Sequence, residues 1–82
     1  MQKLIQSGND FFGKNLKSLR ESRGLSQSDL VRELQLRGRS MSRANYAHIE
    51  QGIRNIFISD LILLKEVLDV PYEAFFKGPV SQ

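Results

Sequence analysis

The chain has 82 residues, of which 40% are hydrophobic and 26% charged, and it contains no cysteine and one histidine. This length suits one small domain with a single core. The composition excludes a disulfide framework and makes a thiolate or histidine metal site untenable, so we expect no cofactor. No apolar run approaches a membrane span and the N-terminus lacks the apolar centre of a secretory signal, so we expect a soluble cytoplasmic protein without membrane contact.

Positive charge is concentrated in the first two thirds of the chain. Residues 1–54 contain ten Lys/Arg and five Asp/Glu, a net charge of +5, whereas residues 55–82 contain two and four, a net charge of −2. Such asymmetry suits a protein that turns one surface toward a polyanion. Chance clustering on a solvated surface explains it equally well, so charge alone does not decide between the two interpretations.

Hydrophobic periodicity predicts an all-α fold of five helices, without strands, repeats or low-complexity tracts. We expect the helical domain to cover residues 11–77, after an N-terminal arm at 1–10 and before a C-terminal tail at 78–82. The first helix is amphipathic, covers residues 11–23 and ends at Gly24.

A capping box predicts the start of the second helix. In the sequence S-Q-S-D, Ser26 caps the helix, while Asp29 reaches back to the Ser26 backbone and its charge favours the positive helix end. Leu30 and Leu34 belong to the buried stripe of this helix. The basic segment 37–40 contains a glycine and is expected to form the connection to the next helix.

The third helix is the element around which the chain is organised. It is expected within residues 42–52, SRANYAHIEQG, with Ser42 as N-cap and Gly52 as the stop. Tyr46 and Ile49 form one thin apolar stripe toward the core. The polar residues off this stripe, whose side chains can hydrogen-bond to base edges or phosphates, are Arg43, Asn45 and His48.

The last third of the chain is more apolar. Residues 53–58 are expected to be a loop partly tucked under the domain, and a fourth helix with a wide apolar face begins near Ser59. A last short helix at 72–76 follows a proline, and its Phe75 and Phe76 are expected to plug the core.

Three stretches resemble the helix-turn-helix domain of the lambda-repressor and Cro-like, or Xre, transcriptional regulators. They are LRESRGLSQ at 19–27, SRANYAHIEQG at 42–52 and LDVPYEAFF at 68–76. Each is a weak signal alone, but together in this order they are specific. The resemblance implies a five-helix lambda-repressor-like domain that binds double-stranded DNA, with the second helix across the phosphate backbone and the third in the major groove.

The resemblance also assigns contacts residue by residue. Gln27 would bind a phosphate and steady the third helix, and Arg43 is the strongest candidate for base recognition, because a bidentate pair to guanine gives about 1–3 kcal/mol of discrimination. Asn45 either pairs with adenine or holds a phosphate, and Ala44 can touch only a thymine methyl. The expected DNA-binding set is Gln27, Ser42, Arg43, Ala44, Asn45, His48 and Arg54.

Some of these residues have plain structural alternatives. His48 is otherwise a hydrated surface histidine, and Arg54 a solvated loop arginine. The resemblance implies that Arg20 and Glu50 form a partly buried ion pair, which is a structural role rather than a catalytic one. Tyr46 stands where the family has a core aliphatic residue, so we expect its ring in the core and its hydroxyl at the surface.

The chain departs from the family in two places. The connection between the second and third helices is longer than the usual tight turn, so the second helix is longer or a basic finger lies near the DNA backbone. Arg37 and Arg39 in this stretch are either phosphate contacts or solvated charges. Ile56 and Phe57 replace a common proline and serine, and exposure of either would suit a subunit contact.

We therefore expect a sequence-specific DNA-binding transcriptional regulator that acts as a repressor. We expect it to bind paired half-sites as a homodimer. Two alternatives stay open: an antitoxin or restriction-controller regulator with a protein partner, and a protein-interaction module that has lost DNA binding. An enzyme is not expected, because the chain has no cysteine nucleophile, no Gly-rich phosphate loop and no cluster of carboxylates with a histidine.

Overall fold

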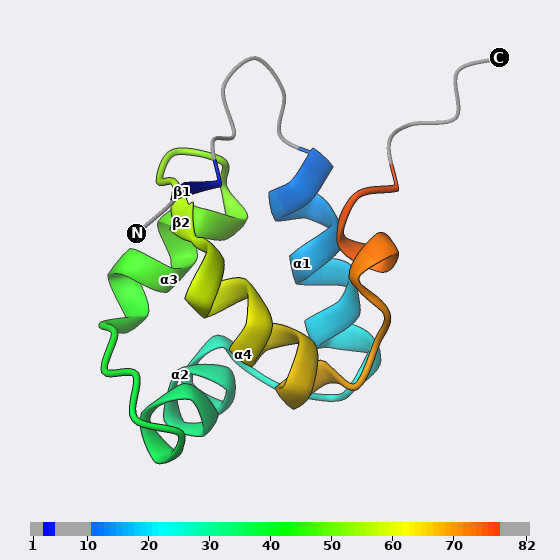
Figure 1. Cartoon of the computed structure of the whole chain (residues 1–82). Helices are drawn as coiled ribbons and strands as arrows, with labels where there is room; N and C mark the ends of the chain where they lie inside the picture. Colours follow the sequence, from blue (N-terminus) through cyan, green and yellow to red (C-terminus); the bar gives the residue numbers. More distant parts are fainter. Residues whose placement is uncertain (1–2, 5–10, 78–82) are drawn as a thin grey trace, which may run out of the picture.

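The protein is mainly helical in its computed structural model, which describes residues 3–4 and 11–77 (Figure 1). The helices are α1 (Phe11–Ser22), α2 (Gln27–Leu36), α3 (Arg43–Glu50), α4 (Ile58–Leu68) and the 3-10 helix η1 (Tyr72–Phe75). The remainder of the expected arm, 1–2 and 5–10, and the expected tail, 78–82, lie outside the described residues. No helix in the described part is long and apolar enough to cross a membrane.

The expectation of five helices is corrected to four α-helices and one 3-10 helix among the described residues. The last element has four residues, and its backbone bonds join residues three apart, from the Ala74 N–H to the Pro71 carbonyl and from the Phe76 N–H to the Glu73 carbonyl. A segment this short cannot close successive α-helical bonds, so the tighter form prevails.

Side-chain caps set the starts of α2 and α3. The Ser26 hydroxyl accepts a hydrogen bond from the Asp29 N–H (3.0 Å), and the Asp29 carboxylate accepts one from the Ser26 N–H (2.9 Å), which confirms the predicted capping box. The Ser42 hydroxyl likewise accepts from the Asn45 N–H (3.1 Å). Gly38 ends α2 with a φ of 90°, a left-handed conformation that favours glycine.

A short antiparallel ladder joins a segment near the N-terminus to the segment just before α4. Strand β1 (Lys3–Leu4) pairs with β2 (Ile56–Phe57), with Lys3 opposite Phe57 and Leu4 opposite Ile56 (Figure 1). The expectation of no strand is therefore wrong. Two-residue strands are too short to show alternation, and their pairing depends on contacts between distant parts of the chain.

The core draws side chains from all the helices and from β2. The buried hydrophobic residues are Phe12, Leu16, Leu30, Leu34, Tyr46, Ile49, Ile56, Leu61, Leu64, Leu68 and Phe75. The rings of Phe12 and Phe75 stack with centroids 5.9 Å apart. Phe76 was expected beside Phe75 in the core but is exposed at the edge of the core, because it follows η1 and only its contact with the Phe12 ring, 5.6 Å between centroids, covers it.

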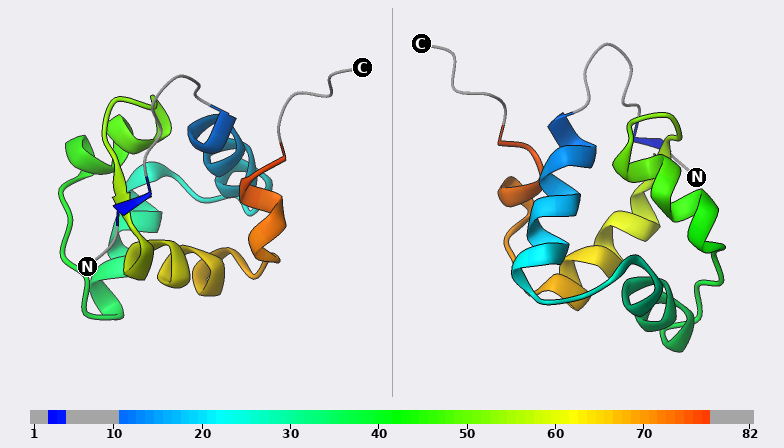
Figure 2. Two further views of the ribbon diagram at one scale, coloured as in Figure 1. Left: turned by 45° about the horizontal axis from the view of Figure 1, so that its top comes forward. Right: turned by 180° about the vertical axis from the view of Figure 1, so that it is seen from behind.

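Helix α3 is packed on one side only. It lies against both α1 and α2, while α1 packs on its other side against η1. Figure 2 shows α3 and the connection that leads into it at one side of the domain, away from η1. One long face of α3 is therefore left uncovered by the other described elements.

Candidate nucleic-acid interface

The exposed face of α3 collects most of the residues expected to contact DNA. Arg43, Ala44 and His48 are exposed and Asn45 is half-buried, whereas Tyr46, Ile49 and Glu50 on the opposite face are buried. Ser42 is also exposed, and its hydroxyl is used for the cap. The helix thus presents guanidinium, amide and imidazole groups on one surface, which are the groups that hydrogen-bond to base edges and phosphates.

A bidentate ion pair ties α3 to α1. The Arg20 Nε donates to Glu50 Oε2 (2.7 Å) and the Arg20 Nη2 donates to Glu50 Oε1 (3.2 Å), while the Arg20 Nη1 donates to the Leu25 carbonyl (2.7 Å). Both side chains are more than nine-tenths buried. The pair therefore connects the buried edge of α3 to the end of α1 and to the α1–α2 turn.

Gln27 completes this cluster. Its Nε2 donates to Glu50 Oε1 (3.1 Å), so the first residue of α2 is linked to the last residue of α3. Burial acts to raise the pKa of Glu50, but Arg20, the nearby Tyr46 hydroxyl and Gln27 outweigh it and hold that pKa below its ordinary value. The hydrogen bond to Glu50 in turn raises the pKa of Arg20. Glu50 is accordingly an ionised structural anchor.

Tyr46 corrects one expectation. Its hydroxyl was expected at the surface, but the whole side chain is buried because the position faces inward between α1 and α2. Burial raises the pKa of Tyr46, and the Glu50 carboxylate raises it further. The hydroxyl makes no hydrogen bond of good geometry among the described residues, but it lies close enough to the Glu50 carboxylate to help lower the pKa of Glu50.

Replacing Tyr46 with phenylalanine is therefore expected to change the free energy of unfolding by less than about 1 kcal/mol. The buried hydroxyl carries a desolvation cost that its approach to Glu50 offsets only in part, and the ring that fills the core is retained. Urea denaturation of the two proteins measures the difference. A loss of more than about 1 kcal/mol would mean that the hydroxyl is well bonded in solution.

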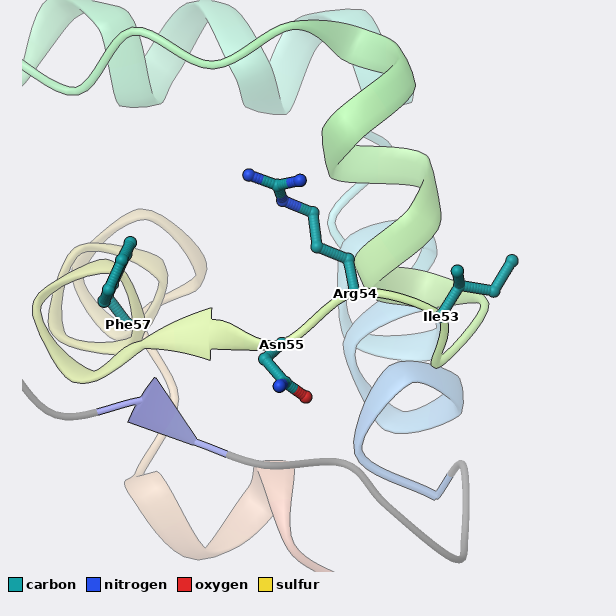
Figure 3. Close-up of a pocket in the computed structure, with 4 residues that line it drawn as sticks. All are labelled: Ile53, Arg54, Asn55 and Phe57. Carbon is teal, nitrogen blue, oxygen red and sulfur yellow. The ribbon is translucent and has the colours of Figure 1, made fainter.

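Arg54 lies just beyond the C-terminal end of α3. The backbone N–H groups of Ile53 and Arg54 both donate to the His48 carbonyl (2.9 and 3.2 Å), so this segment closes the helix. A hollow of about 280 Å³ is lined by Ile53, Arg54, Asn55 and Phe57. Figure 3 shows Arg54 and Phe57 directed to one side of the segment, Asn55 to the other, and Ile53 away from both.

The apolar exposure expected at Ile56 or Phe57 falls on a different residue. Ile56 is buried and Phe57 is half-buried, since both belong to the strand that pairs with β1. Ile53, in contrast, is 70% exposed. It follows α3 directly and is the candidate for a subunit contact in this part of the chain.

Sequence reasoning missed three residues beside this surface. Lys14 and Lys17 are exposed on α1, and Gln51 is exposed just after α3. Together with Gln27, Ala47 and Glu50 they line a second hollow, of about 320 Å³. The spacing of the two lysines places them on one helix face, but nothing local in the sequence indicates that this face lies beside α3.

The described residues contain no group of three His, Cys, Asp or Glu side chains that could hold a metal ion. The site consists of a capped helix with a polar outer face. Its buried side is held by the hydrogen bonds among Arg20, Gln27 and Glu50. Such an arrangement can recognise a ligand by hydrogen bonds and charge.

Comparisons with known proteins agree with this geometry. Residues 12–74 match the family model described as helix-turn-helix domain. The chain is 31% identical over 75 residues, 92% of its length, to an uncharacterized HTH-type transcriptional regulator of Rickettsia conorii, and covers 56% of that protein. It is 29% identical over 75 residues to another of Rickettsia prowazekii, again over 92% of this chain and 54% of the other. The chain spans about half the length of these curated relatives. It belongs to the helix-turn-helix domain family.

Proposed function

We propose that the protein binds double-stranded DNA with α3 in the major groove and regulates transcription as a repressor of the lambda-repressor and Cro-like, or Xre, type. The observation that carries this proposal is the exposed polar face of α3, on which Arg43 and His48 are exposed while a buried ion pair holds the helix in place. The family match and the names of the two relatives support the same function.

Different residues have different roles in this proposal. Arg43 at the start of α3 pairs with a guanine, and Asn45 and His48 contact further base edges or phosphates. Ala44 lies against a thymine methyl, and Ser42 keeps the first turn in place through its cap. Gln27, which is bonded to the last residue of α3, and Arg54, just beyond that residue, contact the DNA backbone at the C-terminal end of α3. These contacts set the orientation of the domain without carrying sequence information.

The protein acts in this proposal as a homodimer. An α3 of eight residues contacts only a few base pairs, and two copies on half-sites one helical turn apart gain affinity and symmetry. Ile53 is exposed and apolar, follows α3 in the chain and is the first candidate for the contact between copies.

Selection of bound sequences from random duplex DNA at two salt concentrations tests the proposal. The wild-type protein should enrich one motif, and affinity should fall steeply with salt because neutralised phosphates release counterions. Arg43→Ala should lose preference at one position by about 5- to 150-fold, the equivalent of about 1–3 kcal/mol. Gln27→Ala should weaken binding to all sequences alike.

Lys65→Ala is the matched control, because Lys65 lies over the Tyr72 ring, 5.2 Å from its centroid, and removing it changes the net charge by the same amount. It should retain the wild-type motif. An unselective pool from the wild-type protein would contradict sequence-specific regulation, and absence of any salt-dependent binding would favour a protein-interaction module. A motif unchanged by Arg43→Ala would remove the role given to that residue.

A further inference from the structure

The connection between α2 and α3, residues 37–42, contains two arginines that are both engaged by carboxylates. The Arg37 Nη1 donates to Glu33 Oε1 (2.8 Å) and to the Glu33 carbonyl (3.1 Å). The Arg39 Nε donates to Asp60 Oδ1 (2.7 Å), its Nη2 to Asp60 Oδ2 (3.4 Å), and its Nη1 to the Ser40 carbonyl (2.8 Å). Sequence alone left both as phosphate contacts or solvated charges, and the structure gives them other partners.

The two pairs differ in burial and in what they connect. Arg37 and Glu33 are one helical turn apart and each is more than one third exposed, so their pair contributes little to rigidity. The Arg37 Nε also approaches Glu66 Oε1 of α4, but only to 4.0 Å and at an exposed carboxylate, so this contact adds little. The Asp60 side chain is only 4% exposed, and it lies in the first turn of α4, 21 positions further along the chain. A carboxylate this buried requires a partner, and Arg39 supplies it.

Arg39 lies in the connection between the end of α2 and the cap that opens α3. Its own N–H donates to the Leu34 carbonyl (2.9 Å), which ends α2, and the Ser42 cap that opens α3 follows three residues later. The guanidinium holds the chain at Ser40 in between. The lengthened connection is thus tied to α4 immediately before the turn of α3 that carries Arg43 (Figure 1).

We propose that Arg39 is a positioning residue for base recognition, which by bonding Asp60 fixes the direction of the first turn of α3. This inference rests on the proposed function. A direct phosphate contact by Arg39 is disfavoured, because three of its five guanidinium N–H groups already donate and because leaving Asp60 would strand a buried carboxylate.

The test compares Arg39→Gln with Arg37→Gln, which removes the same charge from the same connection. For each, Kd is measured at several salt concentrations for the selected duplex and for a scrambled one. Arg39→Gln should reduce the ratio of specific to non-specific affinity about tenfold without changing the salt slope for scrambled DNA. Arg37→Gln should keep the wild-type ratio within about twofold.

Two further variants keep the test sharp. Arg39→Lys keeps the charge but not the forked geometry, and should also lower the ratio while preserving the fold. Arg39→Gln combined with Asp60→Asn should be no worse than Arg39→Gln alone, since no buried charge is then left unpaired. A salt slope reduced by about 0.9 in Arg39→Gln, with the affinity ratio retained, would overturn the proposal in favour of a phosphate contact.

Amide hydrogen exchange in the free protein separates this inference from the proposed function. The Asn45 and Tyr46 N–H groups bond to the Ser42 hydroxyl and carbonyl, so they report on the first turn of α3. In Arg39→Gln they should exchange about tenfold faster than in wild type, with the Leu16 amide of α1 as reference. Unchanged exchange overturns the positioning role even if DNA binding is found. If Arg39→Gln speeds exchange but the wild-type protein selects no DNA sequence, the structural role of the Arg39–Asp60 bond is supported and only the proposed DNA-binding function is rejected.

Discussion

Replacing Glu50 with alanine is expected to lower the free energy of unfolding by about 3–5 kcal/mol. The change leaves the Arg20 guanidinium buried without its two carboxylate contacts and removes the acceptor of the Gln27 amide. Because small domains have only about 5–15 kcal/mol of stability, much of the variant could be unfolded at 37 °C. Urea denaturation followed by circular dichroism measures the loss.

Glu73→Ala is the control, since Glu73 is exposed on η1, and it should change stability by less than about 0.5 kcal/mol. A Glu50→Ala variant within about 1 kcal/mol of wild type would show that the buried pair contributes no more than an exposed one. Arg20→Ala should be destabilised to a similar degree, because it strands the carboxylate instead.

The Glu50 carboxylate also determines how the stability of the domain should change with pH. The pKa of folded Glu50 is held below its ordinary value of 4.5, so the unfolded chain binds the proton first as the pH falls. The resulting stability is fully present above the ordinary pKa and is lost as the pH drops through the folded-state value. Asp29 adds to this acid sensitivity, because hydrogen bonds from the Ser26 backbone and hydroxyl lower its pKa. Glu50→Gln should lose the larger part of this dependence, whereas a wild-type slope in Glu50→Gln would assign it to other groups.

Replacing Gly13 with alanine is expected to destabilise the domain by about 1–3 kcal/mol, although alanine is the better helix former. A Cβ at this position would overlap the Glu50 carbonyl oxygen and lie 2.8 Å from the Ile49 carbonyl oxygen. These are backbone atoms at the end of α3, so they cannot move aside as a flexible side chain can. The helices α1 and α3 would have to separate, and the melting temperature should fall.

Ser18→Ala is the matched comparison, because Ser18 is exposed in the same helix and has room for the change. It should be neutral or slightly stabilising, by a few tenths of a kcal/mol. If Gly13→Ala melted at or above the wild-type temperature, the close approach of α1 to α3 would not exist in solution. DNA binding by the Gly13→Ala protein should also weaken, since α3 is the displaced element.

Local signals in the sequence predicted the elements that carry the site. Ser26 and Ser42 cap α2 and α3 with their own side chains, and the inward stripe of Tyr46 and Ile49 follows from helical spacing. These features depend on residues within one or two turns, so the bounds of α2 and the exposed face of α3 could be predicted without coordinates.

The features that were not predicted depend on contacts between distant parts of the chain. Arg39 and Asp60 pair across 21 positions, in the stretch where the chain departs from the family pattern, so resemblance could not supply the contact. The role of Gly13 depends on the approach of α3, and helix propensity alone suggests the opposite sign for its replacement. The buried hydroxyl of Tyr46 likewise follows from packing rather than from spacing.

The shortness of α3 has a practical consequence. Its eight residues make little more than two turns, and isolated helices shorter than about 12–15 residues rarely persist in water. A synthetic peptide of residues 42–52 should therefore be largely unstructured by circular dichroism. Transplanting these residues into another protein would succeed only where the new host supplies the supports that α1 and α2 provide here.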